Sequence, residues 1–166
     1  MFRGFRFKVK SRCGYTLSEV LTVAGIIILI GLVTGISLFG RRNQADLEIS
    51  AKSMVALLRE AQSKAVAQTG SVAWGVHFEN SNQPYYAMFS GGAYASTTQV
   101  GYYHLPASVI YATSTLASGA SLDVVFNKLD GTASATIITL NLASNSERSA
   151  TVSIGSLGTA AYTLSF

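Results

Sequence analysis

The sequence predicts an α+β fold, in which a long N-terminal α-helix, first transmembrane and then amphipathic, packs on a C-terminal antiparallel β-sheet domain. Three observations support this prediction. Val20–Phe39 is an uncharged apolar run, residues 47–65 repeat apolar side chains every three or four positions, and residues 71–166 repeatedly alternate with a period of two. A helical period followed by a strand period indicates a helix first and a sheet after it.

The first element is a basic leader, residues 1–14. It holds five of the 12 Lys and Arg residues of the chain and none of the 8 acidic residues. The rest of the chain has seven basic and eight acidic side chains, so the overall charge of +4 comes from the leader. We therefore do not expect DNA binding from this charge. The single cysteine, Cys13, also lies in the leader, so the remaining chain has no thiol and no disulfide.

The second element, residues 15–42, is predicted to be a transmembrane helix. As a helix, Val20–Phe39 spans about 30 Å, the thickness of the hydrocarbon core of a bilayer. The basic leader holds the N-terminus in the cytoplasm, so the rest of the chain faces outward. A secretory signal has a shorter apolar stretch and a small-residue cleavage site. A plain signal anchor is the alternative, but it explains neither Gly14 nor Glu19.

Glu19 places one carboxylate at the start of this apolar helix. A carboxylate in an apolar environment is costly unless a cation neutralises it. Cleavage of the chain after Gly14 would create such a cation, the α-amine of Tyr15, four residues before Glu19. In a bundle of these helices, the amine of one subunit can neutralise Glu19 of the next. We therefore predict that Glu19 serves subunit assembly.

The third element, residues 43–166, is predicted to be one globular domain. It consists of an amphipathic half-helix at 43–69, capped at its C-terminus by Gly70, and a β region at 71–166. Two pairs of opposite charge at a spacing of four support the half-helix, Glu48–Lys52 and Glu60–Lys64. Its apolar stripe consists of Leu47, Ala51, Met54, Leu58, Ala61 and Ala65.

The β region is predicted to hold six to eight antiparallel strands laid on the apolar stripe of the helix. Alternating runs lie at 72–78, 122–126, 138–142, 150–154 and 160–166, and less regular strands are expected at 85–89 and 99–104. Turn residues separate them at 80–84, 91–92, 128–131, 144–146 and 155–158.

The sequence predicts no enzyme: no catalytic residue, no metal ligand and no cofactor. His77 and His104 are isolated, and His77 is expected at the surface because it lies opposite the apolar face of its strand. The acidic residues Asp123, Asp130 and Glu147 lack the spacing of a calcium loop. Tyrosines in the middle of the domain are predicted to be exposed, serving packing or, alternatively, a surface for a partner or substrate: Tyr85, Tyr86, Tyr94, Tyr102, Tyr103 and Tyr111.

The segment Cys13-Gly14-Tyr15-Thr16-Leu17-Ser18-Glu19 resembles the processing site of type IV prepilins and type II secretion pseudopilins. Tyr15 stands where that family usually has Phe, and Ser18 where it usually has Ile or Val. The resemblance implies a prepilin peptidase that cuts between Gly14 and Tyr15, with N-methylation of Tyr15. It also implies that the helix at 15–42 forms the core of a filament, with other pilin or pseudopilin subunits and an inner-membrane assembly platform as partners.

Three further segments are similar to the GspH and FimT subgroup of pseudopilins. Leu57–Ala65 is similar to its "L…AR..A" helix segment, Val125–Gly131 to its "F…G" strand and turn, and Val152–Ala160 to its closing "I.v…G" hairpin. In members that take up DNA, arginines around the last hairpin contact the DNA. Here Arg148 is the only basic residue after Lys128, so DNA binding by this route is not expected.

We therefore expect a prepilin-like structural subunit that initiates or caps a type IV pilus or a type II secretion pseudopilus as a minor subunit. A main filament subunit is the alternative within this class. A membrane-anchored extracytoplasmic domain for adhesion or ligand binding is the alternative outside it, and it would keep its leader. The expected location is the inner membrane, with the N-terminus in the cytoplasm and the C-terminal domain outside, and then the filament, periplasmic or on the cell surface.

Overall fold

The computed structural model describes residues 14–165, and the side chains of residues 32–40 lie outside this description. The predicted leader, apart from Gly14, therefore lies outside the described residues, as does Cys13. The chain divides into two units, Met1–Phe39 and Gly40–Phe166. Each unit is described here by itself.

Helix α1, Leu17–Val66, begins in the first unit and ends in the second. Among the described residues, no helix combines the length and the apolar character needed to cross a membrane. The predicted apolar run Val20–Phe39 extends into residues 32–40, whose side chains lie outside the described part. A transmembrane helix at 15–42 therefore stays a prediction.

In the second unit, α1 has the apolar stripe that its sequence predicts. All six stripe residues, from Leu47 to Ala65, have side chains that are fully buried. On the solvent side, Lys52 pairs with Glu48 at 2.6 Å and Lys64 with Glu60 at 2.9 Å. The stripe and both charge pairs are thus confirmed.

The helix ends earlier than predicted, and Gly70 is not its cap. The last helical residue is Val66, and Gln68 already has a left-handed backbone, with φ 52°. The amide of Gln68 donates to the carbonyl of Ala65 at 3.1 Å, which closes the last turn. Gly70 instead lies inside a short 3₁₀ turn, Thr69–Ser71. Gln68 makes the left-handed turn that the sequence pattern assigns to a glycine.

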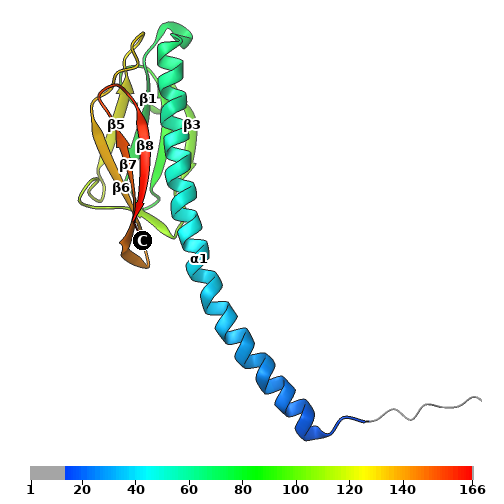
Figure 1. The fold of residues 1–166 in the computed structure, drawn as a ribbon. Coiled ribbons are helices and arrows are strands. Elements are labelled where there is room, and N and C mark those ends of the chain that lie inside the picture. The colour runs from blue at the N-terminus through cyan, green and yellow to red at the C-terminus, as the bar shows by residue number, and fades with distance from the viewer. Residues whose placement is uncertain (1–13, 166) are drawn as a thin grey trace, which may run out of the picture. The chain divides into compact units, whose positions relative to one another are not determined.

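Eight strands follow within residues 74–165, and they form two four-stranded antiparallel sheets. Figure 1 shows them beside α1. The first sheet has the order β3-β2-β1-β5, with β1 at Trp74–Glu79, β2 at Tyr85–Ser90, β3 at Gln99–His104 and β5 at Ser121–Phe126. The second has the order β4-β6-β7-β8, with β4 at Val109–Tyr111, β6 at Thr136–Leu142, β7 at Asn145–Ile154 and β8 at Ala160–Ser165. Strand β4 is not evident in the sequence, because three residues are too few to show an alternation.

Both sheets and the C-terminal half of α1 share one core (Figure 1). Two tyrosines that the sequence places at the surface belong to this core: Tyr86 is 5% exposed and Tyr111 is 1% exposed. The hydroxyl of Tyr111 donates to the carbonyl of Tyr85 at 3.0 Å, so its polar atom is satisfied inside the core. Burial raises the pKa of both phenols. The prediction that these two tyrosines are exposed was wrong, because a phenol can be buried once its hydroxyl has a hydrogen-bond partner.

We expect residues 43–166 to fold alone, because the core is made by α1 and the two sheets and needs no thiol. About 120 residues can bury enough apolar surface for one cooperative domain. Purified without metal or reductant, this fragment should melt in one transition with a mixed helix-and-strand circular dichroism spectrum. A fragment that folds only with calcium, or that only aggregates, would contradict this account of the core.

Candidate functional site

The predicted processing site lies in an open stretch of chain directly before α1. Gly14 is exposed, and a Cβ placed on it would meet no described atom within 4 Å. The side chains of Tyr15 and Leu17 are 81% and 85% exposed. Within the described residues, both residues that flank the predicted cut, Gly14 and Tyr15, are therefore exposed.

Thr16 caps the N-terminus of α1, and the pattern Thr-x-x-Glu at residues 16–19 is typical of such a cap. The amide of Glu19 donates to the backbone carbonyl of Thr16 at 3.1 Å, and Thr16 Oγ1 lies 3.4 Å from the same amide. The side chain of Ser18 also takes part, because its hydroxyl lies 3.2 Å from Thr16 Oγ1, within hydrogen-bonding distance. Its backbone carbonyl accepts the hydroxyl of Thr22 at 2.7 Å. A polar residue at position 18, where the pilin pattern has an aliphatic one, thus takes part in the first turn of the helix.

Glu19 lies in the first turn of α1 and is exposed. Its carboxylate is close to the positive end of the helix dipole, an interaction that stabilises a helix by about 0.3–1 kcal/mol. Helix capping therefore explains part of the presence of an acid here. It does not explain why the acid is followed directly by apolar residues.

Those apolar residues cover the helix on every side. Within residues 17–31, large aliphatic side chains are half or more exposed, which is unusual for a helix in water. They are Leu17, Val20, Leu21, Val23, Ile26, Ile27, Ile28, Leu29 and Ile30.

A second group of residues joins the end of α1 to two turns of the β region. Arg59 donates to the carbonyl of Ala160, with Nη2 at 2.9 Å and Nε at 3.3 Å. One turn further, Gln62 Nε2 donates to the carbonyls of Leu157, at 3.0 Å, and Gly131, at 3.3 Å. These bonds join the helix, the β5–β6 turn and the β7–β8 turn.

The three short segments singled out in the sequence therefore meet at one place. Arg59 and Gln62 come from the helix segment, Gly131 from the strand-and-turn segment, and Gly158 from the closing hairpin. A Cβ on Gly158 would overlap the carbonyl oxygen of Gly131 and lie 2.5 Å from Gln62 Nε2. We name these four residues the helix–hairpin junction. Its contacts explain why the similarity consists of a helix motif and two separate glycines.

A family model described as "Type II transport protein GspH" matches residues 50–158 of the chain. This range covers the helix–hairpin junction and most of both sheets. The chain belongs to the GspH family. At the level of this family it is a type II secretion pseudopilin, a structural class of protein and not a class of enzyme. Comparisons with curated proteins and with solved structures gave no match.

One residue of this GspH family chain lies where the sequence did not place it. His77 was expected at the surface, but it is 5% exposed. Its Nδ1 lies 2.5 Å from Asp123 Oδ1, and the ring of Tyr94 stacks on it with a centroid distance of 3.8 Å. Tyr94 belongs to the segment between β2 and β3, which folds back over the sheet. Strand alternation cannot reveal such a covering segment, and this is why the prediction was wrong.

The surroundings of His77 are polar and aromatic. Glu79 accepts a hydrogen bond from Tyr85 Oη at 2.6 Å and lies 3.4 Å from His77 Nε2. The bond from Tyr85 holds the pKa of Glu79 below its usual range, so this carboxylate stays ionised at neutral pH. Within residues 14–165, no three His, Cys, Asp or Glu side chains are grouped in a way that could hold a metal ion.

Proposed function

We propose that this chain is a minor subunit of a type II secretion pseudopilus that is cut after Gly14 and assembles through its N-terminal helix. The observation that supports this most is the surface of α1 over residues 17–31. Exposed aliphatic side chains surround the helix there, and its one acid lies in the first turn. In a filament, neighbouring helices of the same kind would cover this surface and supply a cation to Glu19.

The proposed pathway begins at the inner membrane. The basic leader stays in the cytoplasm, the apolar run at 20–39 enters the bilayer, and residues 43–166 face outward. A prepilin peptidase then cuts between Gly14 and Tyr15, and N-methylation can follow at Tyr15. An assembly platform finally passes the helix from the lipid into the filament core, where other pseudopilins surround it.

The similarity to the GspH and FimT subgroup supports a minor role, in which the subunit initiates the filament or lies at its tip. A main subunit and a membrane-anchored adhesion domain make different predictions. A main subunit would be present in amounts comparable to the filament itself. An anchored adhesion domain would keep residues 1–14.

Intact-mass analysis of the protein from native membranes tests the proposal directly. We expect the mass of a chain that starts at Tyr15, with or without one methyl group. Gly14→Leu should abolish this processing, because a bulky side chain would stand at the residue before the cut. Gly4→Leu changes a glycine of the same leader away from the cut and should leave processing normal. An uncut chain in cells that contain the peptidase would contradict the proposal.

A further inference from the structure

Strand β3 leaves one edge of the first sheet open. It pairs with β2 on one side, and neither described sheet places a strand on its other side. Val100, Tyr102 and Tyr103 are 53%, 43% and 48% exposed. An open edge has backbone amide and carbonyl groups that can pair with another chain.

The other three sheet edges are protected in ways that β3 is not. Strand β4 has only three residues, and β5 carries the charged Asp123. At the edge strand β8, the carbonyl of Ala160 is taken by Arg59 of α1. Strand β3 contains no lysine, no acid and no proline, the residues that usually keep an edge from pairing. Its pairing with β2 shifts register at Val100, so the regular part of the open edge is Gly101–His104.

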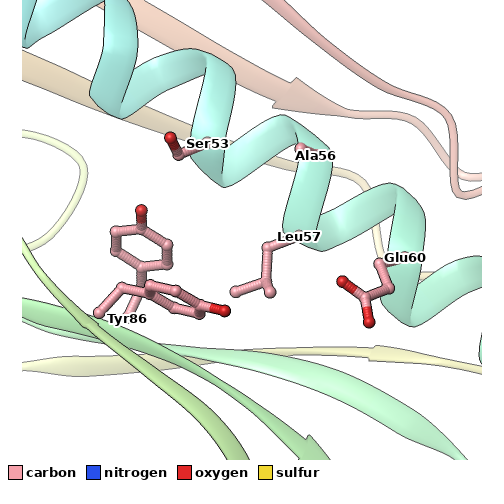
Figure 2. A pocket seen from close by; sticks show the side chains of 6 residues that line it. Ser53, Ala56, Leu57, Glu60 and Tyr86 are labelled. Atoms are coloured by element: carbon pink, nitrogen blue, oxygen red, sulfur yellow. The ribbon is translucent and has the colours of Figure 1, made fainter.

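The helix side of β3 has a pocket. The ring of Tyr103 stacks on that of Tyr86 with a centroid distance of 5.5 Å. Figure 2 shows side chains of α1 on one wall of this pocket and Tyr86 across from them. The lining residues are Ser53, Ala56, Leu57, Glu60, Tyr86 and Tyr103.

The opposite side of β3 combines aromatic rings with carboxylates. Tyr102 lies 4.5 Å from Tyr85 between ring centroids, and His104 meets Tyr102 edge-on at 4.8 Å. The hydroxyl of Tyr85 reaches Glu79, and Asp123 lies beyond it beside His77. Among the described contacts of these two carboxylates there is no lysine and no arginine.

We propose that β3 binds an extended segment of another protein as an added strand, with arginine or lysine side chains laid on the ring of Tyr102 at the edge and attracted by the charge of Glu79, which lies two strands further in, on β1. Main-chain hydrogen bonds along the open edge would supply affinity, and alternate side chains would supply specificity. Tyrosine faces together with an ionised carboxylate attract a cation. The charge of this side therefore selects a basic partner.

The alternation of a strand also restricts the residues between the basic ones. They point to the other side of the sheet, towards the pocket between Tyr103 and Leu57. Most of its lining is apolar or aromatic, with Ala56, Leu57, Tyr86 and Tyr103 beside Ser53 and Glu60, so we expect a small apolar side chain there. The partner is thus an extended segment in which basic and small apolar residues alternate. This inference stands independently of processing at Gly14 and of assembly through Glu19.

A pair of capped peptides tests the proposal on the full-length protein in detergent. One is about eight residues long, a common length for a strand, and alternates arginine with valine. The other has glutamate in place of each arginine. Measured by fluorescence polarisation, the arginine peptide should bind at least about tenfold more tightly, a difference of about 1.4 kcal/mol. Equal binding of the two peptides would overturn the proposal.

Two lysine variants separate strand pairing from a general charge effect. Val100→Lys places a charge on the open edge of β3, and we expect it to abolish binding of the arginine peptide. Ile110→Lys adds the same charge to the edge strand β4, where Ile110 is 42% exposed, and should leave binding unchanged. An equal loss in both variants would show that charge alone governs binding and would refute the added strand.

Hydrogen exchange and a carboxylate variant complete the test. Bound peptide should slow the exchange of backbone amides within 99–104, which adsorption to the surface would not do. Glu79→Gln keeps the shape of the side chain and should weaken the arginine peptide by about tenfold. Unchanged exchange in β3, or pairing of β3 with a second copy of the chain in place of the peptide, would overturn the proposal.

Discussion

Gly158→Ala is expected to lower the free energy of unfolding of the outer domain by about 2–5 kcal/mol. Gly158 has φ 75°, a left-handed conformation that costs a residue with a Cβ about 1–2 kcal/mol. The new methyl group would also overlap the carbonyl oxygen of Gly131 and press on Gln62. Overpacking of this kind adds about 1–3 kcal/mol. Urea unfolding followed by circular dichroism measures the sum.

Gly119→Ala provides a matched control for this prediction. Gly119 has the same φ of 75°, but a Cβ there meets nothing within 4 Å. Its substitution should therefore show the backbone cost alone, about 1–2 kcal/mol. The difference between the two variants measures the contact at the helix–hairpin junction. Equal losses would mean that the junction does not confine Gly158.

Glu19→Ala is expected to reduce filament assembly at least about tenfold while leaving membrane insertion normal or higher. Removal of the carboxylate eliminates a polar group that is costly in lipid, so insertion becomes easier. In the filament, the amine of Tyr15 on a neighbouring subunit would lose its partner, and an unpaired buried charge costs about 3–5 kcal/mol. Inserted protein, cleaved protein and crosslinked subunits should be measured in the same cells.

Thr16→Ala and Glu48→Ala are the controls for this experiment. Thr16→Ala weakens the start of α1 but keeps the carboxylate, whereas Glu48→Ala removes an exposed carboxylate from the same helix. Both should assemble nearly normally. A defect in Thr16→Ala as large as that in Glu19→Ala would show that Glu19 acts through the start of the helix and not through a neighbour. Normal assembly of Glu19→Ala would favour the plain anchor.

The elements that a local period can encode were predictable from the sequence. The stripe from Leu47 to Ala65 repeats with the helical period, and every one of its residues is buried. The alternating strands were placed correctly for the same reason, with β7 extending further towards its N-terminus than its apolar run. Turns at 91–92, 128–131 and 155–158 were marked by residues that favour them.

Features made by distant segments were not predictable in this way. His77 is buried because the segment that carries Tyr94 covers it. The sequence of β1 alone does not predict this contact. Tyr86 and Tyr111 are buried because two sheets and a helix meet around them. Gln62 and Gly158 are 96 positions apart in the chain, so their contact could be suspected only through the family resemblance.

The helix–hairpin junction leaves the amino-acid sequence of the β7–β8 turn, residues 155–158, largely free to vary. The side chains of Arg59 and Gln62 donate only to main-chain carbonyls, those of Ala160, Leu157 and Gly131. None of these hydrogen bonds involves a side chain of the turn. The side chain of Leu157 is 72% exposed. Apart from Gly155 and Gly158, this turn can therefore be resurfaced without loosening the helix from the sheet. Substitutions in this turn can therefore change what the surface binds while the contact between helix and sheet stays the same.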